Sequence, residues 1–146
     1  QSGAMGYGLP AAIAAKITCP DRTVVCFAGD GDFQMNCTEL ATAMQAGAQP
    51  IILVLNNGIY GTIRAHQERH YPARVSGTTM ENPDFVALAK AYRFHAERVE
   101  TTADFAAAFD RAAASGTGAV LELNVSAEAI TPRRTLSQMR EAALAK

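Results

Sequence analysis

Two short apolar runs that end in polar residues constrain the fold of this chain more than any other feature. The run at residues 23–28 leads into GDG at residues 29–31, and the run at residues 51–55 leads into the pair NN that ends at Asn57. Helical periodicity between the runs predicts two parallel strands joined by a helix. The carboxyl ends of parallel strands meet at one edge of a sheet, so Asp30 and Asn57 are expected at the edge where such sheets bind ligands.

The residue types at this edge suit a magnesium-bound diphosphate. Asp30 offers a carboxylate oxygen and Asn57 a neutral amide oxygen, and Mg²⁺ is usually held by one or two protein ligands together with phosphate oxygens. Glycines allow backbone N–H groups to approach a phosphate closely. Taken alone, Asp-Gly and Asn-Asn-Gly predict ordinary turns. The pairing of the two motifs favours a metal–diphosphate clamp instead.

The paired motif resembles the signature of thiamine-diphosphate-dependent enzymes, in which GDG, the 24 residues 32–55 and then NN follow one another. The flanking segments SGAMGYGLPAAIAAK (residues 2–16) and NNGIYG (residues 56–61) extend the match. The chain looks like the carboxy-terminal, diphosphate-binding domain of the decarboxylase and acetolactate synthase branch. This resemblance covers nearly all of residues 1–146, which we expect to form one domain of a longer enzyme, because the chain begins at Gln1 inside a glycine-rich turn.

Alternating strand and helix patterns predict an α/β fold with a doubly wound, mostly parallel sheet and helices on both faces, which is the thiamine diphosphate-binding fold. The run at residues 23–28 reads as a strand buried on both faces, and GDG as the loop that follows it. Residues 69–82 read as a surface loop. Strands are expected at residues 23–28, 51–55, 94–99 and 119–125, and helices at residues 7–17, 40–47 (ending at Gly47), 60–68, 84–92, 103–115 (capped by Thr102) and 132–146.

Composition excludes several classes of function. A net charge of −1 argues against general binding to nucleic acid or anionic membranes, and no apolar run is long enough to span a bilayer. The three cysteines form no metal-ligand pattern, and their odd number argues against a closed disulfide framework, so a cytoplasmic protein is expected. His66 and His70 lack the intervening glutamate and the third ligand that a zinc site needs, so zinc is rejected.

The resemblance implies specific roles for residues of this chain toward thiamine diphosphate and Mg²⁺. The metal ligands would be the Asp30 carboxylate, the Asn57 amide oxygen and the Ile59 backbone carbonyl. The Gly3 carbonyl and Met5 would contact the aminopyrimidine and keep the cofactor bent, although a methionine in a turn more often fills a gap in the core. The complete set of expected cofactor-binding residues is Gly3, Met5, Gly29, Asp30, Gly31, Asp32, Asn57, Ile59, Tyr60 and Gly61.

Three positions depart from the family pattern. Asp32 stands where many members carry a small neutral residue, and its charge would repel phosphate unless the side chain points away. Ile63 stands where some decarboxylases have a proton-transferring glutamate, and His66 where acetolactate synthases often have a tryptophan. Arg64 or His66 could bind a substrate carboxylate, but a solvated helix face is the simpler interpretation.

The resemblance also implies a partner. In this family a glutamate from a pyrimidine-binding domain, usually on the other subunit of a homodimer or homotetramer, activates the cofactor, so no catalytic residue is expected in this chain and the isolated chain should be inactive. The expected reaction is decarboxylation of a 2-oxo acid, with or without ligation of the product to a second carbonyl. Two alternatives stay open. One is a Rossmann-like dinucleotide-binding module, although GDGDFQ lacks the third glycine of that motif. The other is a catalytically degenerate scaffold.

Overall fold

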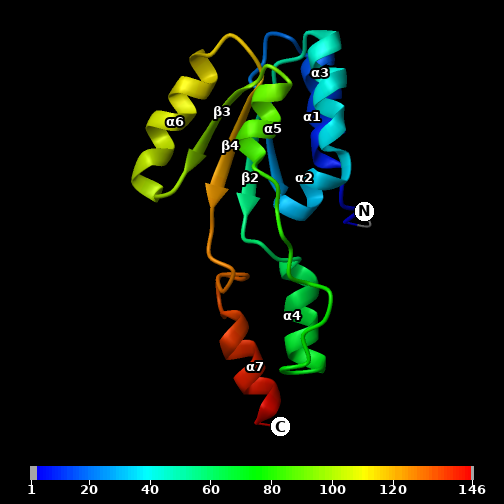
Figure 1. Ribbon diagram of the computed structural model, residues 1–146, viewed down its shortest axis with the longest axis vertical. Coiled ribbons are helices and arrows are strands. Elements are labelled where there is room, and N and C mark those ends of the chain that lie inside the picture. Colours follow the sequence, from blue (N-terminus) through cyan, green and yellow to red (C-terminus); the bar gives the residue numbers. More distant parts are fainter. Residues whose placement is uncertain (1–2, 146) are drawn as a thin grey trace. The chain divides into compact units, whose positions relative to one another are not determined.

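A computed structural model describes residues 3–145 of the chain (Figure 1). These residues fall into two compact units. Unit 1 lies within Gln1–Asn56 and Pro83–Asn124, and unit 2 within Asn57–Asn82 and Val125–Lys146. Ser2, which belongs to the flanking motif, and Lys146, at the end of the expected closing helix, lie outside the described residues.

Unit 1 is built on a sheet of four parallel strands in the order β1-β2-β4-β3. The strands are β1 (Val25–Gly29), β2 (Ile51–Asn56), β3 (His95–Val99) and β4 (Ala119–Asn124). Every neighbouring pair is parallel. Because parallel strands need crossover connections, helices lie between them in the chain. The predicted α/β fold with a parallel sheet is confirmed.

Helices cover both faces of this sheet (Figure 1). On one face Ile52, Val54 and Val120 pack with residues of α1 (Gly8–Thr18), α2 (Asp30–Asn36), α3 (Leu40–Ala46) and α5 (Phe85–Ala91). On the other face Leu53, Leu121 and Val99 pack against α6 (Thr102–Ala114). Alternate strand residues therefore enter two separate cores, as the period of two along a strand requires.

Strand β1 does not match the expectation of burial on both faces. Its residues alternate between exposed and buried, and Phe27 is 71% exposed. The reason is its position at the edge of the sheet, because α6 packs against β3 and β4 rather than against β1. An apolar run alone does not distinguish a central strand from an edge strand.

Several helix boundaries also differ from the expected ones. Helix α6 is preceded by Thr101 rather than capped by Thr102, and the Thr101 hydroxyl donates to the Asp104 carboxylate (2.5 Å) instead of accepting from the backbone. The closing helix α7 (Leu136–Leu144) begins after Thr135, which forms a capping box with Gln138. Gly47 ends α3 in the left-handed conformation, as predicted.

Unit 2 consists mainly of α4 (Gly61–His70) and α7, which pack against each other. Glu68 is fully buried and accepts from Nε and Nη2 of Arg140 at 2.8 and 2.5 Å. The segment after α4 is not wholly a surface loop, since Thr78 within it is buried. None of the helices among residues 3–145 is both long and apolar enough to cross a membrane.

Candidate functional site

The carboxyl ends of β1 and β2 lie side by side in unit 1, where Gly29 pairs with Leu55. Directly after β1, the Asp30 side chain is only 2% exposed, and its Oδ1 accepts from the Gly31 N–H at 3.0 Å. At Gly29, by contrast, an added Cβ would meet no atom within 4 Å. The end of β1 thus combines a buried carboxylate with backbone that a ligand can approach.

The sequence predicts a loop at the GDG motif, and this prediction is wrong, because the motif forms the start of a helix. Gly29 is extended and precedes α2, whose first turn contains Asp30 and Asp32. Acidic residues in a first turn stabilise a helix because they face the positive end of its dipole. Backbone N–H groups in a first turn have no backbone acceptor within the helix, and here the Gly31 N–H donates to the Asp30 carboxylate. N–H groups of this kind suit phosphate oxygens.

Unit 2 begins with the second motif. The Asn57 Oδ1 accepts from the Ile59 N–H at 3.1 Å, which is the local turn that Asn-Asn-Gly predicts. Ile59 forms an antiparallel bridge with Thr79, and hydrogen bonds from Met80 N to Gly58 O (2.8 Å) and from Tyr60 N to Thr78 O (3.0 Å) flank it. This pairing fixes the backbone around Ile59.

Gly61 is the first residue of α4 and lies close to Asn57. A Cβ at Gly61 would come within 2.7 Å of Ile130 Cδ1 and 3.3 Å of Asn57 Nδ2. A larger residue would therefore press on the Asn57 amide. Tyr60, directly before α4, is half-buried.

The turn that carries Gly3 and Met5 precedes α1 in unit 1. Met5 is 40% exposed, so the alternative that it fills a gap in the core is wrong. Gly3 has a φ of +62°, which favours glycine, and an added Cβ there would meet nothing within 4 Å. Both residues leave room for a ligand.

Glu122 on β4 is a residue that sequence reasoning missed. It is buried, its Oε1 accepts from Asn56 Nδ2 at 2.7 Å, and its Oε2 accepts from Arg98 Nε at 3.0 Å. It therefore orients the first asparagine of the NN pair. Glu122 lies near Asn56 because β2 and β4 are neighbours, with Asn56 paired to Asn124. No sequence pattern reveals which strands are neighbours, so Glu122 could not be predicted.

Arg64 and His66 are the two residues of α4 that the sequence offers for binding a substrate carboxylate. The Arg64 guanidinium instead donates to the hydroxyls of Thr78 (2.7 Å) and Thr79 (2.9 Å), and so it ties the following segment to α4. The His66 and His70 rings stack with their centroids 6.2 Å apart, and both are exposed. Among residues 3–145 no group of three or more His, Cys, Asp or Glu side chains could hold a metal ion.

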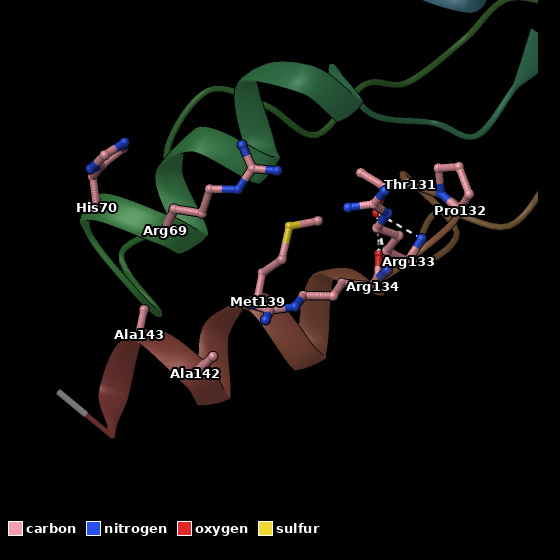
Figure 2. A pocket seen from close by; sticks show the side chains of 9 residues that line it. All are labelled: Arg69, His70, Thr131, Pro132, Arg133, Arg134, Met139, Ala142 and Ala143. Atoms are coloured by element: carbon pink, nitrogen blue, oxygen red, sulfur yellow. Dashed lines mark hydrogen bonds between the residues drawn. The ribbon is translucent and has the colours of Figure 1, made fainter.

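A cavity of about 680 Å³ opens in unit 2 between α4 and α7 (Figure 2). Its floor includes Met139 and two alanines of α7, and Arg69, Arg133 and Arg134 lie along its rim. Cationic side chains over an apolar floor suit an anionic group. Neither Arg64 nor His66 lines this cavity.

Comparison with known proteins identifies the family. Residues 1–123 match the family model described as thiamine pyrophosphate enzyme, C-terminal TPP binding domain. The chain belongs to this family. Thiamine pyrophosphate is another name for thiamine diphosphate.

Curated relatives support the same family. The chain is 44% identical over 99 residues to acetolactate synthase of Arthrospira platensis, and the match covers 66% of this chain and 17% of the relative. It is 40% identical over 109 residues to the acetolactate synthase isozyme 2 large subunit of Escherichia coli (strain K12), covering 74% of this chain and 20% of the relative. The chain therefore spans about a fifth of the length of the curated relatives it matches.

A solved structure matches the fold as well. The thiamine diphosphate-dependent 4-hydroxybenzoylformate decarboxylase of Rhodococcus jostii RHA1 superposes with a TM-score of 0.78 at 34% identity, over 84% of this chain and 23% of that chain. The thiamine diphosphate-binding fold is thus confirmed. These matches do not favour the dinucleotide-binding alternative.

The residues of unit 1 suit the diphosphate end of the cofactor, since they include the buried Asp30 carboxylate, the open backbone at Gly29 and the first turn of α2. Taken by itself, unit 2 has an amide oxygen at Asn57. Hard oxygen donors of this kind suit Mg²⁺.

Proposed function

We propose that this chain is the C-terminal cofactor-binding part of a longer, cytoplasmic, thiamine diphosphate-dependent enzyme that decarboxylates a 2-oxo acid. The enzyme can also join the product to a second carbonyl, as the names of the acetolactate synthase relatives suggest. The observation that carries the proposal is the buried Asp30 carboxylate where β1 passes into α2.

Asp30, Asn57 and the carbonyl of Ile59 would hold Mg²⁺, which in turn would bind the diphosphate. A carboxylate supplies the negative charge that a divalent cation needs, and its burial strengthens that interaction. The N–H groups of Gly31 and Asp32 would donate to phosphate oxygens at the start of α2. Gly29, Tyr60 and Gly61 would leave the backbone close to the ligand.

At the other end of the cofactor, the Gly3 carbonyl would accept from the exocyclic amine and Met5 would support the bent conformation. When bound, the thiazolium supplies an electron sink for the carboxylate-bearing carbon of the substrate. The chain's own residues bind and orient the cofactor. A pyrimidine-binding domain, contributed by the partner subunit of a homodimer or homotetramer, would supply the activating glutamate.

Calorimetric titration of the full-length protein tests the proposal. Thiamine diphosphate should bind in the presence of Mg²⁺, and removal of the metal with a chelator should weaken binding at least tenfold. Asp30→Ala should weaken Mg²⁺-dependent binding about 100-fold, since a charged ligand is lost without replacement. Asp110→Ala, which removes an exposed carboxylate on α6, is the matched control.

Three results would contradict the proposal. Turnover of a 2-oxo acid by residues 1–146 alone would show that no outside acid is needed. Binding of NAD without a response to thiamine diphosphate would favour a dinucleotide module. Melting of the full-length protein that is unchanged by cofactor and Mg²⁺ would indicate a degenerate scaffold.

A further inference from the structure

Residues 3–6, which include a turn at Met5 and Gly6, precede α1, and no strand of the sheet pairs with them in the described part of the chain. Gly3 and Gly6 both have positive φ, at +62° and +81°. A short glycine-containing segment of this kind has high conformational entropy unless other contacts fix it. Two side chains of α2 provide those contacts.

Asp32 and Asn36 lie one helical turn apart on α2, so they face the same side. The Asp32 Oδ1 accepts from the Gly6 N–H, and the Asn36 Nδ2 donates to the Gly6 carbonyl at 2.6 Å. Gly6 is buried, and a buried peptide group without partners is costly. Together the two side chains satisfy both polar backbone groups of Gly6.

The close approach also explains why residue 6 is a glycine. A Cβ at Gly6 would lie 2.8 Å from Asn36 Nδ2 and 3.2 Å from the Met35 Cβ. Asp32 reaches further along the same segment, since its Oδ2 would lie 3.6 Å from a Cβ at Gly8. The segment around Gly6 is therefore docked on α2.

We propose that Asp32 and Asn36 are positioning residues that fix the turn of residues 3–6 to α2 and so set the distance between the two ends of the cofactor site. The inference rests on the proposed function, in which the first turn of α2 binds the diphosphate and Gly3 and Met5 contact the aminopyrimidine. It gives the Asp32 side chain a role that a small neutral residue cannot fill, and it directs the carboxylate to Gly6 rather than toward phosphate.

The test compares two ligands in the full-length protein. Thiamine diphosphate reaches both ends of the site, whereas inorganic pyrophosphate reaches only the diphosphate end. In Asp32→Ala and in Asn36→Ala, the Kd for thiamine diphosphate should rise about tenfold, while the Kd for pyrophosphate with Mg²⁺ should change less than twofold. Asp32→Asn keeps an acceptor oxygen and should restore most of the affinity. Asp110→Ala is the control.

Hydrogen exchange without any ligand gives an independent readout. Backbone amides of residues 4–8 should exchange at least tenfold faster in Asp32→Ala and Asn36→Ala, whereas those of β2 keep their wild-type rates. If Asp32→Ala does not fold, Asn36→Ala decides the question by itself.

Unchanged exchange at residues 4–8 in both variants would overturn the inference, and so would equal losses of affinity for thiamine diphosphate and pyrophosphate. A wild-type protein that binds neither ligand would overturn the proposed function instead. The exchange measurement would still decide whether α2 holds the turn.

Discussion

Cys26 on β1 is a free cysteine whose surroundings keep it unreactive. Burial, and to a lesser extent the charge of Asp32, raise the pKa of the Cys26 thiol to about 11. Only a thiolate attacks electrophiles readily, so this cysteine is inert at neutral pH although it lies on the same strand as Gly29 of the GDG motif. Its role is to pack in the core of unit 1.

Alkylation with iodoacetamide tests whether Cys26 is unreactive. Since the pKa of Cys26 is raised in the folded protein, its thiolate should be nearly absent at pH 8 and should form only as the pH passes about 10. Cys26 should react at least tenfold more slowly than the exposed Cys19 at pH 8. Mass spectrometry of the modified peptides distinguishes the two sites, and equal rates would show that Cys26 is accessible and ionised.

The site residues could be predicted from sequence to different degrees. The spacing of Asp30 and Asn57 predicts that two parallel strands end just before them. In unit 1, Gly29 at the end of β1 pairs with Leu55 of β2, so the two strand ends do lie next to each other. Glu122 and Asn36 were missed because their partners, Asn56 and Gly6, are far away in the chain. Such contacts depend on tertiary structure and leave no periodic signal.

At the scale of elements, β3 and α6 are joined by an ion pair. Glu97 accepts from Nε and Nη2 of Arg111 at 2.8 and 2.6 Å, and His95 Nε2 lies 2.8 Å from Glu97 Oε1. These contacts lower the pKa of Glu97 to about 2, and the hydrogen bonds from Arg111 have the largest effect. Because more than half of the Arg111 side chain is exposed, solvent screens the pair and its contribution to stability is small.

The pH dependence of this contribution follows from the lowered pKa. It is fully present above the pKa of an unfolded glutamate, about 4.3, and is lost as the pH falls toward 2. The unfolding free energy of Glu97→Gln should therefore be slightly lower than that of wild type at pH 7, with the gap closing between pH 4 and pH 2. Urea denaturation at several pH values measures it. A gap that is constant with pH would mean that the charge is not responsible.

Element types were predicted better than their limits. The β2 strand and the Gly47 helix end were confirmed because a buried apolar run and a left-handed glycine are strong local signals. The burial of β1 and the start of α2 were predicted wrongly. The burial of β1 was wrong because its edge position is set by the order of the strands, which the sequence does not reveal. The start of α2 was missed because it depends on the extended Gly29 and on the acidic residues of the first turn.

At the scale of the whole molecule, each unit has its own core. In unit 2 the core is small, comprising Ala65, Leu136 and Met139, and the buried Glu68–Arg140 pair lies across α4 and α7. The pKa of Glu68 is lowered, mainly by the Arg140 hydrogen bonds. Removing one partner of a buried pair leaves the other charge uncompensated.

Glu68→Gln should therefore destabilise unit 2 locally, by about 2–3 kcal/mol, because Arg140 is partly exposed and can recover some hydration. Amides of α4 and α7 should exchange faster, while those of β2 and β4 keep their rates. Glu141→Gln, on the exposed side of α7, is the matched control. Faster exchange throughout the sheet would show that the two units unfold together.

The buried Glu122 carries a consequence for engineering. One carboxylate on β4 serves both the carboxamide at the tip of β2 and the guanidinium of β3. Transplanting only the GDG and NN segments onto a foreign α/β scaffold would leave Asn56 without its acceptor. A successful graft has to bring Glu122 along, and with it Arg98 as counter-charge, so the smallest transferable module spans all four strands of the sheet rather than two short segments.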